Sequence, residues 1–367
     1  MSRIAPLLKN TIKTQRLLPT KTTTIGVHPG TLGYQVQKLV VEQHCFKAPH
    51  QPALQNVALL FSHCNGFNKE TMHPLIRRVV AGIHQQDQYK QTDLSVFAWD
   101  ARSHGDSARL NEGTFLDSYS WFDHAMDTQQ VITSFGLQKE YDAVIGVGHS
   151  FGASAMLLLE FLFPNSFSGI CAIEPVMANG IESVEKRAKS PILSSLKRRD
   201  TWPNKMACYE SLVSRPFWNT LHPEVLALYV NDALYETADG TVKLKTPKEQ
   251  EYVSALVCIM RHTKTQFIPP SSDQHLYTVG YFGGATAYSS LRAVTIPLEL
   301  VYADKSTYVT VDPLALPDLN PKHIRSTVIP GTHMVSNERP DAIVPHVIDV
   351  MDRALVNATK GQPKSKL

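Results

Sequence analysis

The sequence predicts an α/β fold: a mostly parallel central sheet with helices on both faces, interrupted by a helical cap insertion. Three observations predict it. Short β-rich runs alternate with helical stretches from about residue 34 onward, as in a parallel sheet with crossover helices. The β-rich runs end where polar residues begin. The alternation then stops for about 120 residues between Glu174 and Ile296, where helical patterns replace it.

Six apolar runs are predicted to be buried strands, and their polar ends locate the site. They cover residues 56–64, 94–100, 141–150, 169–175, 296–304 and 326–333. Upstream of them, "YQVQKLVVEQHCF" (34–46) alternates well enough to predict a first pair of strands joined as a hairpin. Ligands of open α/β sheets bind outside the carboxyl ends of the strands, so we expect the site where these polar residues gather.

These patterns divide the chain into five parts. We expect an N-terminal extension (1–33), a first core part (34–177), a helical cap (178–292), a second core part (293–358) and a tail (359–367). Helices are predicted in the cap over "HPEVLALYVNDALYE" (222–236) and "TPKEQEYVSALVCIMRH" (246–262).

Composition narrows the class of protein. The chain has 36 Lys and Arg against 33 Asp and Glu, a net charge of +3, which does not predict a nucleic-acid partner. With 43% hydrophobic and 19% charged residues, it is typical of a soluble globular protein. No apolar stretch approaches the ~20 residues of a transmembrane helix. The first 21 residues lack the apolar core and cleavage site of a secretory signal, so we expect no secretion.

Five cysteines without a C-x-x-C pair predict neither a disulfide framework nor a zinc site. Asp100, His104 and Asp106 have the spacing of a tight polar loop rather than of metal ligands. We therefore expect no metal and no organic cofactor.

The last three residues, Ser365, Lys366 and Leu367, match the peroxisomal address that an import receptor binds. They follow "NATKGQPK", a polar tail that would leave them accessible. The sequence thus predicts a protein of the peroxisomal matrix with the import receptor as a partner. The competing interpretation is an ordinary solvated terminus.

Ser150 is the candidate nucleophile. It lies in Gly148-His149-Ser150-Phe151-Gly152, between a predicted strand and the apolar helix "ASAMLLLEFLF". The glycines permit a tight strand-to-helix turn that lifts the hydroxyl above the sheet, and the helix N-terminus favours developing negative charge. In isolation this pattern also fits a small residue in a tight turn, but the flanking strand and helix favour the nucleophile.

A serine hydroxyl needs a base within hydrogen-bond reach. Of the 15 histidines, His333 fits best, because it follows the last predicted strand, and the chain order is then serine first and histidine last. His149, His63 and His104 are predicted to have structural roles.

The residue sequence leaves two candidates for the acid that orients the base. Asp304 follows the strand "PLELVYAD", although Ser306 stands where an aspartate is expected in that loop. Glu174 ends the strand "AIE", 24 residues after Ser150. We favour Glu174 because its strand end is next to the nucleophile strand, and the orienting role needs proximity.

An oxyanion hole needs two backbone N–H groups aimed at the developing charge. Phe151 is predicted to supply one. Asn65 in "SHCNGFNKE" is predicted to supply the other. Cys64 is not expected to be a second nucleophile, because no acid–base partner is evident for it.

In the predicted cap, six Lys and Arg residues lie between 186 and 199, and they could bind the phosphates of a coenzyme A thioester. A solvated helix face is the default interpretation. Phe217, Trp218, Leu226 and Tyr229 could line an acyl pocket, although packing within the cap is the simpler explanation.

With these residues in place, the chain resembles the α/β-hydrolase superfamily over nearly its whole length. Within it, the chain is similar to the fungal peroxisomal hydrolases that include a yeast peroxisomal lipase and acyl-CoA hydrolases. The matching stretches are "SHCNGFNKE", "DARSHGDSA", "GHSFGA", "IEPV", "HPEVLALYV", "PGTHMV" and the terminal "SKL".

The resemblance implies a serine hydrolase acting on acyl esters or acyl thioesters with a hydrophobic acyl group. Some relatives place an aspartate where this chain has Glu174, which supports that choice of acid. The alternative from another class is a non-catalytic scaffold that binds a hydrophobic ligand or partner, since a fold does not guarantee its chemistry.

Overall fold

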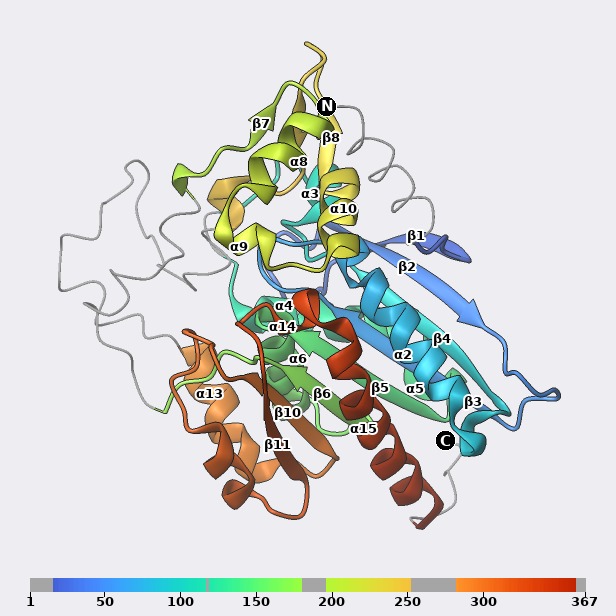
Figure 1. Ribbon diagram of the computed structural model, residues 1–367. Helices are drawn as coiled ribbons and strands as arrows, with labels where there is room; N and C mark the ends of the chain where they lie inside the picture. Colours follow the sequence, from blue (N-terminus) through green and yellow to red (C-terminus); the bar gives the residue numbers. More distant parts are fainter. Residues whose placement is uncertain (1–15, 117–118, 180–195, 252–281, 361–367) are drawn as a thin grey trace.

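An eight-stranded sheet forms the centre of the molecule in the computed structural model, which describes residues 16–116, 119–179, 196–251 and 282–360 (Figure 1). The strand order is β1-β2-β4-β3-β5-β6-β10-β11. From β4 to β11 all neighbours run parallel, whereas β2 is antiparallel to both β1 and β4, so the predicted mostly parallel sheet is confirmed. The strands are Lys21–Gly26 (β1), Lys38–Phe46 (β2), Gln55–Ser62 (β3), Thr92–Trp99 (β4), Ala143–His149 (β5), Gly169–Ile173 (β6), Leu298–Ala303 (β10) and Ile324–Ile329 (β11).

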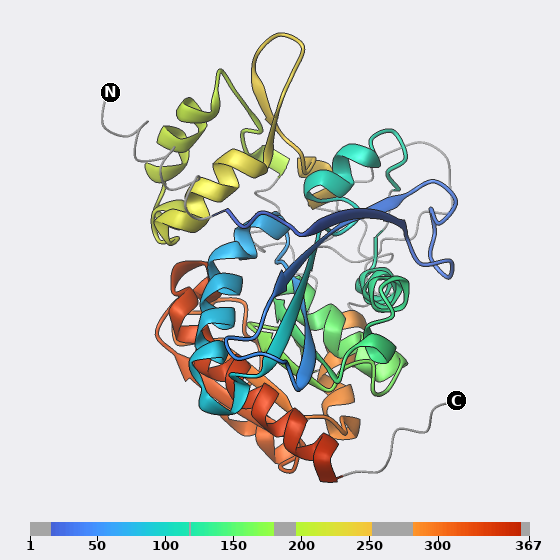
Figure 2. The ribbon, with the colours of Figure 1, turned by 90° about the vertical axis from the view of Figure 1, so that its right-hand side faces the viewer.

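Helices cover both faces of this sheet (Figure 2). One layer holds α2 (His73–Gln85) and α15 (Pro340–Lys360), which pack on each other and close one apolar core. The opposite layer holds α4 (Trp121–Ser134), α6 (Phe151–Leu162) and α13 (Phe282–Ser290). The central strands are buried on both faces, which is why their sequences are nearly continuous apolar runs.

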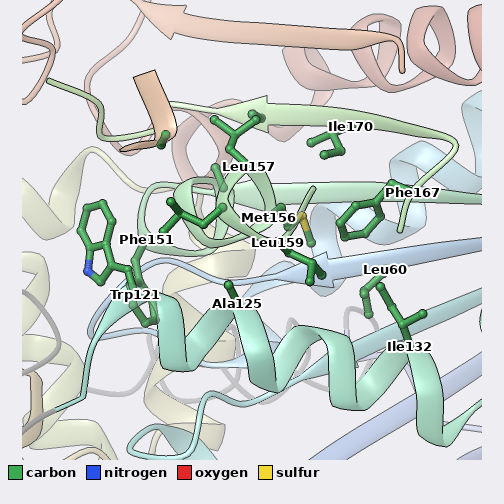
Figure 3. Packing of buried hydrophobic residues seen from close by; sticks show 14 of the residues in the cluster. Leu60, Trp121, Ala125, Ile132, Phe151, Met156, Leu157, Leu159, Phe167 and Ile170 are labelled. Carbon is green, nitrogen blue, oxygen red and sulfur yellow. The ribbon is translucent and has the colours of Figure 1, made fainter. Parts of the chain in front are cut away.

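The packing around α6 fixes the position of the helix that follows Ser150. Figure 3 shows Met156 and Leu159 on the side of α6 that is toward Ala125 and Ile132 of α4, and Leu157 on the other side of α6. These side chains are all essentially inaccessible to solvent. A helix held in this way cannot shift along the sheet without opening cavities, so its first residues are held rigidly at the sheet edge.

Residues 196–251 lie over the carboxyl ends of the parallel strands, and we call them the cap (Figure 1). It contains the helices α8, α9 and α10 and a small antiparallel sheet in the order β7-β9-β8. Its elements are Thr201–Trp202 (β7), Lys205–Val213 (α8), Pro216–Asn219 (α9), Pro223–Asp232 (α10), Leu234–Glu236 (β8) and Val242–Leu244 (β9). The apolar core of the cap includes Phe67 and Met334 from the main domain, so the two parts are packed together.

Three sequence-based expectations differ from the structure here. The cap was expected to be helical, but it also holds the three-stranded sheet. Residues 1–33 were expected to be an extension, but β1 lies within them and pairs with β2, Thr24 opposite Val40. Residues 34–46 contain one strand, β2 (Lys38–Phe46), rather than a hairpin, because the partner of β2 comes from upstream.

The end of the predicted cap at residue 292 also differs. Helix α13 lies before that boundary but packs against α6, and Ala287 belongs to the same apolar core as the sheet. Gly283 lies against the Trp121 ring, where a Cβ would be 3.3 Å from it. This helix therefore completes the main domain, and its small residues allow the close approach.

Two expectations concern residues outside the described parts of the chain. These are most of the predicted helix 246–262 and the terminal Ser365, Lys366 and Leu367. Among the described helices, none has the length and apolar character needed to cross a membrane.

Candidate active site

Ser150 occupies a strained turn between β5 and α6. Its backbone has φ 53° and ψ −116°, a conformation that residues other than glycine rarely adopt. The Ser150 N–H donates to the Ile173 carbonyl at 2.9 Å, which ties the turn to the neighbouring strand β6. Strain of this kind persists only where the surrounding structure enforces it, and it is typical of functional sites.

The two glycines that flank Ser150 are required by close backbone contacts. A Cβ on Gly148 would lie 2.6 Å from the Ala153 Cα, and one on Gly152 would lie 2.5 Å from the Ser62 Oγ. Neither contact leaves room for a side chain. Close packing at the turn therefore requires glycine at both positions.

His333 lies in the loop after β11 and faces Ser150. Its Nε2 is 2.8 Å from the Ser150 Oγ, and its Nδ1 is 2.7 Å from Oε2 of Glu174. A carboxylate only accepts hydrogen bonds, so Nδ1 carries the proton and Nε2 presents its lone pair to the serine hydroxyl. The His333 side chain is 13% exposed. It is therefore shielded but open to a small reactant.

Glu174 follows β6 in a left-handed conformation, with φ 50°. Its carboxylate is buried and accepts three hydrogen bonds, from His333 Nδ1, from the Ala303 N–H at 2.6 Å and from the Ser306 hydroxyl. A buried carboxylate is costly unless donors surround it, and these three donors meet that need. The structure thus brings Ser150, His333 and Glu174 together in one hydrogen-bonded row.

Asp304, the other candidate acid, is not part of this row. It is exposed, and its Oδ1 accepts the Gly331 N–H at 2.9 Å. Its carboxylate therefore stabilises the loop that precedes His333 and does not contact the imidazole. The strand β10 ends so that Ser306, two residues further on, points toward Glu174 instead.

The two predicted oxyanion donors, Phe151 and Asn65, come from different parts of the fold. Phe151 is the first residue of α6, where backbone N–H groups have no partner within the helix. Asn65 lies in the loop after β3, with its side-chain Nδ2 donating to the Glu251 carbonyl at 2.9 Å. The assignment of the Asn65 backbone N–H to the oxyanion hole stays a prediction.

Buried histidines hold the loop that contains Asn65. The Ala101 N–H donates to His63 Nε2 at 3.1 Å, and the Gly66 N–H donates to His104 Nε2 at 3.0 Å. Burial lowers the pKa of both histidines, so they remain neutral and act as hydrogen-bonding supports. Burial also raises the pKa of the Cys64 thiol. Cys64 is therefore protonated at neutral pH and does not offer a thiolate nucleophile.

Asp100 and Asp106 form ion pairs with Lys69, a contact that the sequence did not predict. The Lys69 ammonium is fully buried and lies 3.0 Å from Asp100, 2.6 Å from Asp106 and 2.6 Å from Glu70. Burial opposes the charge, but the carboxylates outweigh burial and hold the Lys69 pKa well above its usual value. This cluster joins the loop after β3 to the loop after β4, close to Asn65 in the sequence.

One group of buried side chains in the described chain has the composition of a metal site. Donor atoms of Glu42, His44 and His73 lie within 4.8 Å of one another. However, the Leu17 N–H donates to His73 Nδ1 at 3.1 Å, so the proton is on Nε2 and points to Glu42 at 3.2 Å. The contacts of His73 are thus those of a hydrogen-bonded cluster rather than of a metal ligand.

The cap residues singled out in the sequence divide into two sets. Trp218, Leu226 and Tyr229 are buried in the core of the cap, whereas Phe217 is 48% exposed. Packing within the cap therefore accounts for the first three. Of the basic residues, Arg198 forms an ion pair with Glu251.

The sequence of the chain also matches a known protein family. The model of the alpha/beta hydrolase family matches residues 59–346, which include Ser150, Glu174 and His333. The chain belongs to this family. The fold class predicted from the sequence, an α/β-hydrolase, is confirmed.

Individual relatives of this α/β-hydrolase include fungal enzymes. The type I acyl-CoA thioesterase mpaH of Penicillium roqueforti (strain FM164) is 26% identical over 258 residues, which cover 63% of this chain. The match spans only 58% of the length of that thioesterase. The peroxisomal membrane protein LPX1 of Saccharomyces cerevisiae is 25% identical over 181 residues, 46% of each chain.

Solved structures share the fold. The peroxisomal alpha-beta-hydrolase Lpx1 of Saccharomyces cerevisiae superimposes with a TM-score of 0.71 at 19% identity, covering 95% of this chain and 92% of that one. An E-2-(acetamidomethylene)succinate hydrolase gives 0.62 at 17% identity, covering 90% and 100%. The predicted resemblance to fungal peroxisomal hydrolases of the Lpx1 type is confirmed.

Tyr308 was missed from the sequence, and His149 has the structural role expected of it through a contact that the sequence did not specify. The Tyr308 ring packs on the His333 imidazole with their centroids 4.4 Å apart. His149 donates from Nε2 to the His333 carbonyl at 2.8 Å, which holds the backbone of the base in place. No periodicity or motif signals either contact, because both depend on how the loop after β10 and the loop after β11 fold back.

Proposed function

We propose that this chain is a peroxisomal serine hydrolase that cleaves acyl esters or acyl thioesters through an acyl-enzyme intermediate. The observation that carries the proposal is the hydrogen-bonded row from the Ser150 hydroxyl through His333 to Glu174, at 2.8 and 2.7 Å. A nucleophile, a base in the correct tautomer and a buried acid that orients it are the three parts this chemistry needs.

In the first half of the reaction, Ser150 Oγ attacks the acyl carbonyl carbon and its proton passes to His333 Nε2. The bond between the acyl carbon and the leaving oxygen or sulfur then breaks, and the imidazolium returns the proton to the leaving group. Glu174 stabilises the imidazolium that exists between these steps. The Phe151 and Asn65 N–H groups are assigned to the negative oxygen of the tetrahedral intermediate.

In the second half, His333 takes a proton from water while the water oxygen attacks the acyl carbon. The bond from that carbon to Ser150 Oγ breaks, and Oγ recovers the proton. The product is a carboxylic acid with a hydrophobic acyl group. No step calls for a cofactor.

The leaving group is an alcohol or coenzyme A. The likeness to an acyl-CoA thioesterase supports the thioester. The basic cap residues add less than the sequence suggested, because Glu251 pairs with Arg198 and offsets its charge. Arg199 is exposed and keeps its charge, with one N–H donating to the Thr201 carbonyl at 2.7 Å.

Peroxisomal location is part of the proposal. It is supported by the terminal Ser365-Lys366-Leu367 and by the likeness to peroxisomal LPX1. The import receptor is the partner that this tripeptide would bind.

A substrate panel tests the proposed function. Purified protein is assayed with nitrophenyl esters and with acyl-CoA thioesters of matched chain lengths, and release of nitrophenol or free thiol is followed. We expect turnover of one or both series. If kcat/KM is higher for the thioester at equal chain length, the leaving group is coenzyme A. No turnover in either series, together with no reaction toward a fluorophosphonate, would favour the non-catalytic scaffold.

His149 offers a separate check on how the base is held. Burial and the nearby His333 lower the pKa of His149 to about 3, so it stays neutral and can only support the His333 backbone. We expect His149→Ala to lower kcat by about tenfold, the value of one hydrogen bond of roughly 1.4 kcal/mol. The midpoints of the pH–rate profile should not move.

The matched control is His84→Ala, because His84 also contacts a backbone carbonyl, that of Thr92 at 3.0 Å, but lies on α2. We expect His84→Ala to leave kcat within about twofold. A shift of the acid midpoint in His149→Ala would show that His149 itself titrates during the reaction and would contradict the supporting role.

A further inference from the structure

Ser306 contacts Glu174, although the proposed reaction gives Ser306 no direct role. Its hydroxyl donates to Oε2 of Glu174, the same oxygen that accepts the proton-bearing Nδ1 of His333. The other oxygen, Oε1, is held by the Ala303 N–H at 2.6 Å. Both oxygens of the carboxylate are therefore fixed, and the Ser306 hydroxyl determines how Oε2 meets the imidazole.

We propose that Ser306 is a positioning residue for the triad acid, because its hydroxyl fixes the Glu174 oxygen that meets the His333 imidazole. The inference rests on the proposed function, because it concerns the base of that reaction. It assigns to Ser306 an effect transmitted through Glu174, without contact between Ser306 and the substrate.

The surroundings of Glu174 support the positioning role. Glu174 is 1% exposed, so water does not replace a lost donor. The titratable groups beside it are His333 and Tyr302, and burial, reinforced by Glu174, keeps the Tyr302 pKa well above its usual value. Tyr302 therefore stays neutral, and the Ser306 hydroxyl and Ala303 N–H are what disperse the charge on the carboxylate.

The test is Ser306→Ala, with Ser306→Thr as the variant that keeps the hydroxyl. Loss of the donor concentrates negative charge beside the imidazole and favours its protonated form. We expect kcat to fall about tenfold and the acid midpoint of the kcat/KM profile to move to higher pH. Ser306→Thr should restore both. A merely structural role would lower the amount of folded protein without moving the midpoint.

A wild-type pH profile for a folded Ser306→Ala variant would overturn the proposal. Folding is checked by circular dichroism. This failure differs from failure of the proposed function itself, in which the wild-type protein hydrolyses no ester or thioester. In that case both proposals fall together.

Discussion

Replacing Ser150 with alanine is expected to lower kcat by about four to six orders of magnitude. The hydroxyl is the attacking group, and nothing else in the described site can form the covalent bond, since burial keeps the neighbouring Cys64 thiol protonated. Removing one oxygen from a 7% exposed side chain should leave the fold intact. The measurement is steady-state hydrolysis of the best substrate in the panel, with the melting temperature recorded beside it.

A serine just beyond the far end of α6 provides the control. Ser166 lies in the loop that follows α6, and its hydroxyl donates to the Phe163 carbonyl at 2.6 Å. Ser166→Ala removes a hydroxyl of the same kind at the other end of α6 from Ser150, and kcat should stay within about twofold. If Ser150→Ala kept a tenth or more of the wild-type rate, the hydroxyl would not be the nucleophile.

The largest effect on stability is expected at Lys69. Its ammonium is fully buried among Asp100, Asp106 and Glu70. Lys69→Ala would leave these carboxylates without their common cation, and removing one partner of a buried ion pair typically costs about 3–5 kcal/mol. We expect the free energy of unfolding to fall by about that amount, measured by urea denaturation followed by circular dichroism.

Lys47→Ala is the matched control, because Lys47 also pairs with an aspartate, Asp93 at 2.7 Å, but on the surface. The Lys47 side chain is 79% exposed, so solvent screens the pair, and the urea midpoint should not change measurably. Equal midpoints for the two variants would contradict the structural role of the Lys69 cluster.

Much of this site could be predicted because it depends on local pattern. The strand, the glycines and the apolar helix around Ser150 are contiguous, so their arrangement follows from the residues themselves. His333 could be found because the last strand ends just before it. The same reasoning located Glu174 and Asp304 at strand ends but could not separate them.

What separated the two acids is side-chain direction. Glu174 adopts a left-handed conformation at the end of β6, and this turns its carboxylate toward His333. Asp304 turns toward the Gly331 N–H instead. Such directions depend on backbone angles at single residues, which neither periodicity nor propensity specifies.

The rest of what was missed depends on long-range packing. Strand β1 was assigned to an extension, because its pairing with β2 is not visible in "KTTTIG" alone. Helix α13 was assigned to the cap, although small residues let it pack against the main domain. The Lys69 cluster joins residues 31 and 37 positions apart, so a lysine in a polar loop gave no signal of burial.

The central claim is that the Ser150 oxygen forms the covalent intermediate, and the site of a mechanism-based adduct tests it most directly. The protein is treated with a fluorophosphonate, digested and examined by peptide mass spectrometry, with His333→Ala treated in parallel. We predict one adduct, on Ser150, formed far more slowly in His333→Ala. An adduct on another residue, or wild-type protein left unmodified while folded, would contradict the claim.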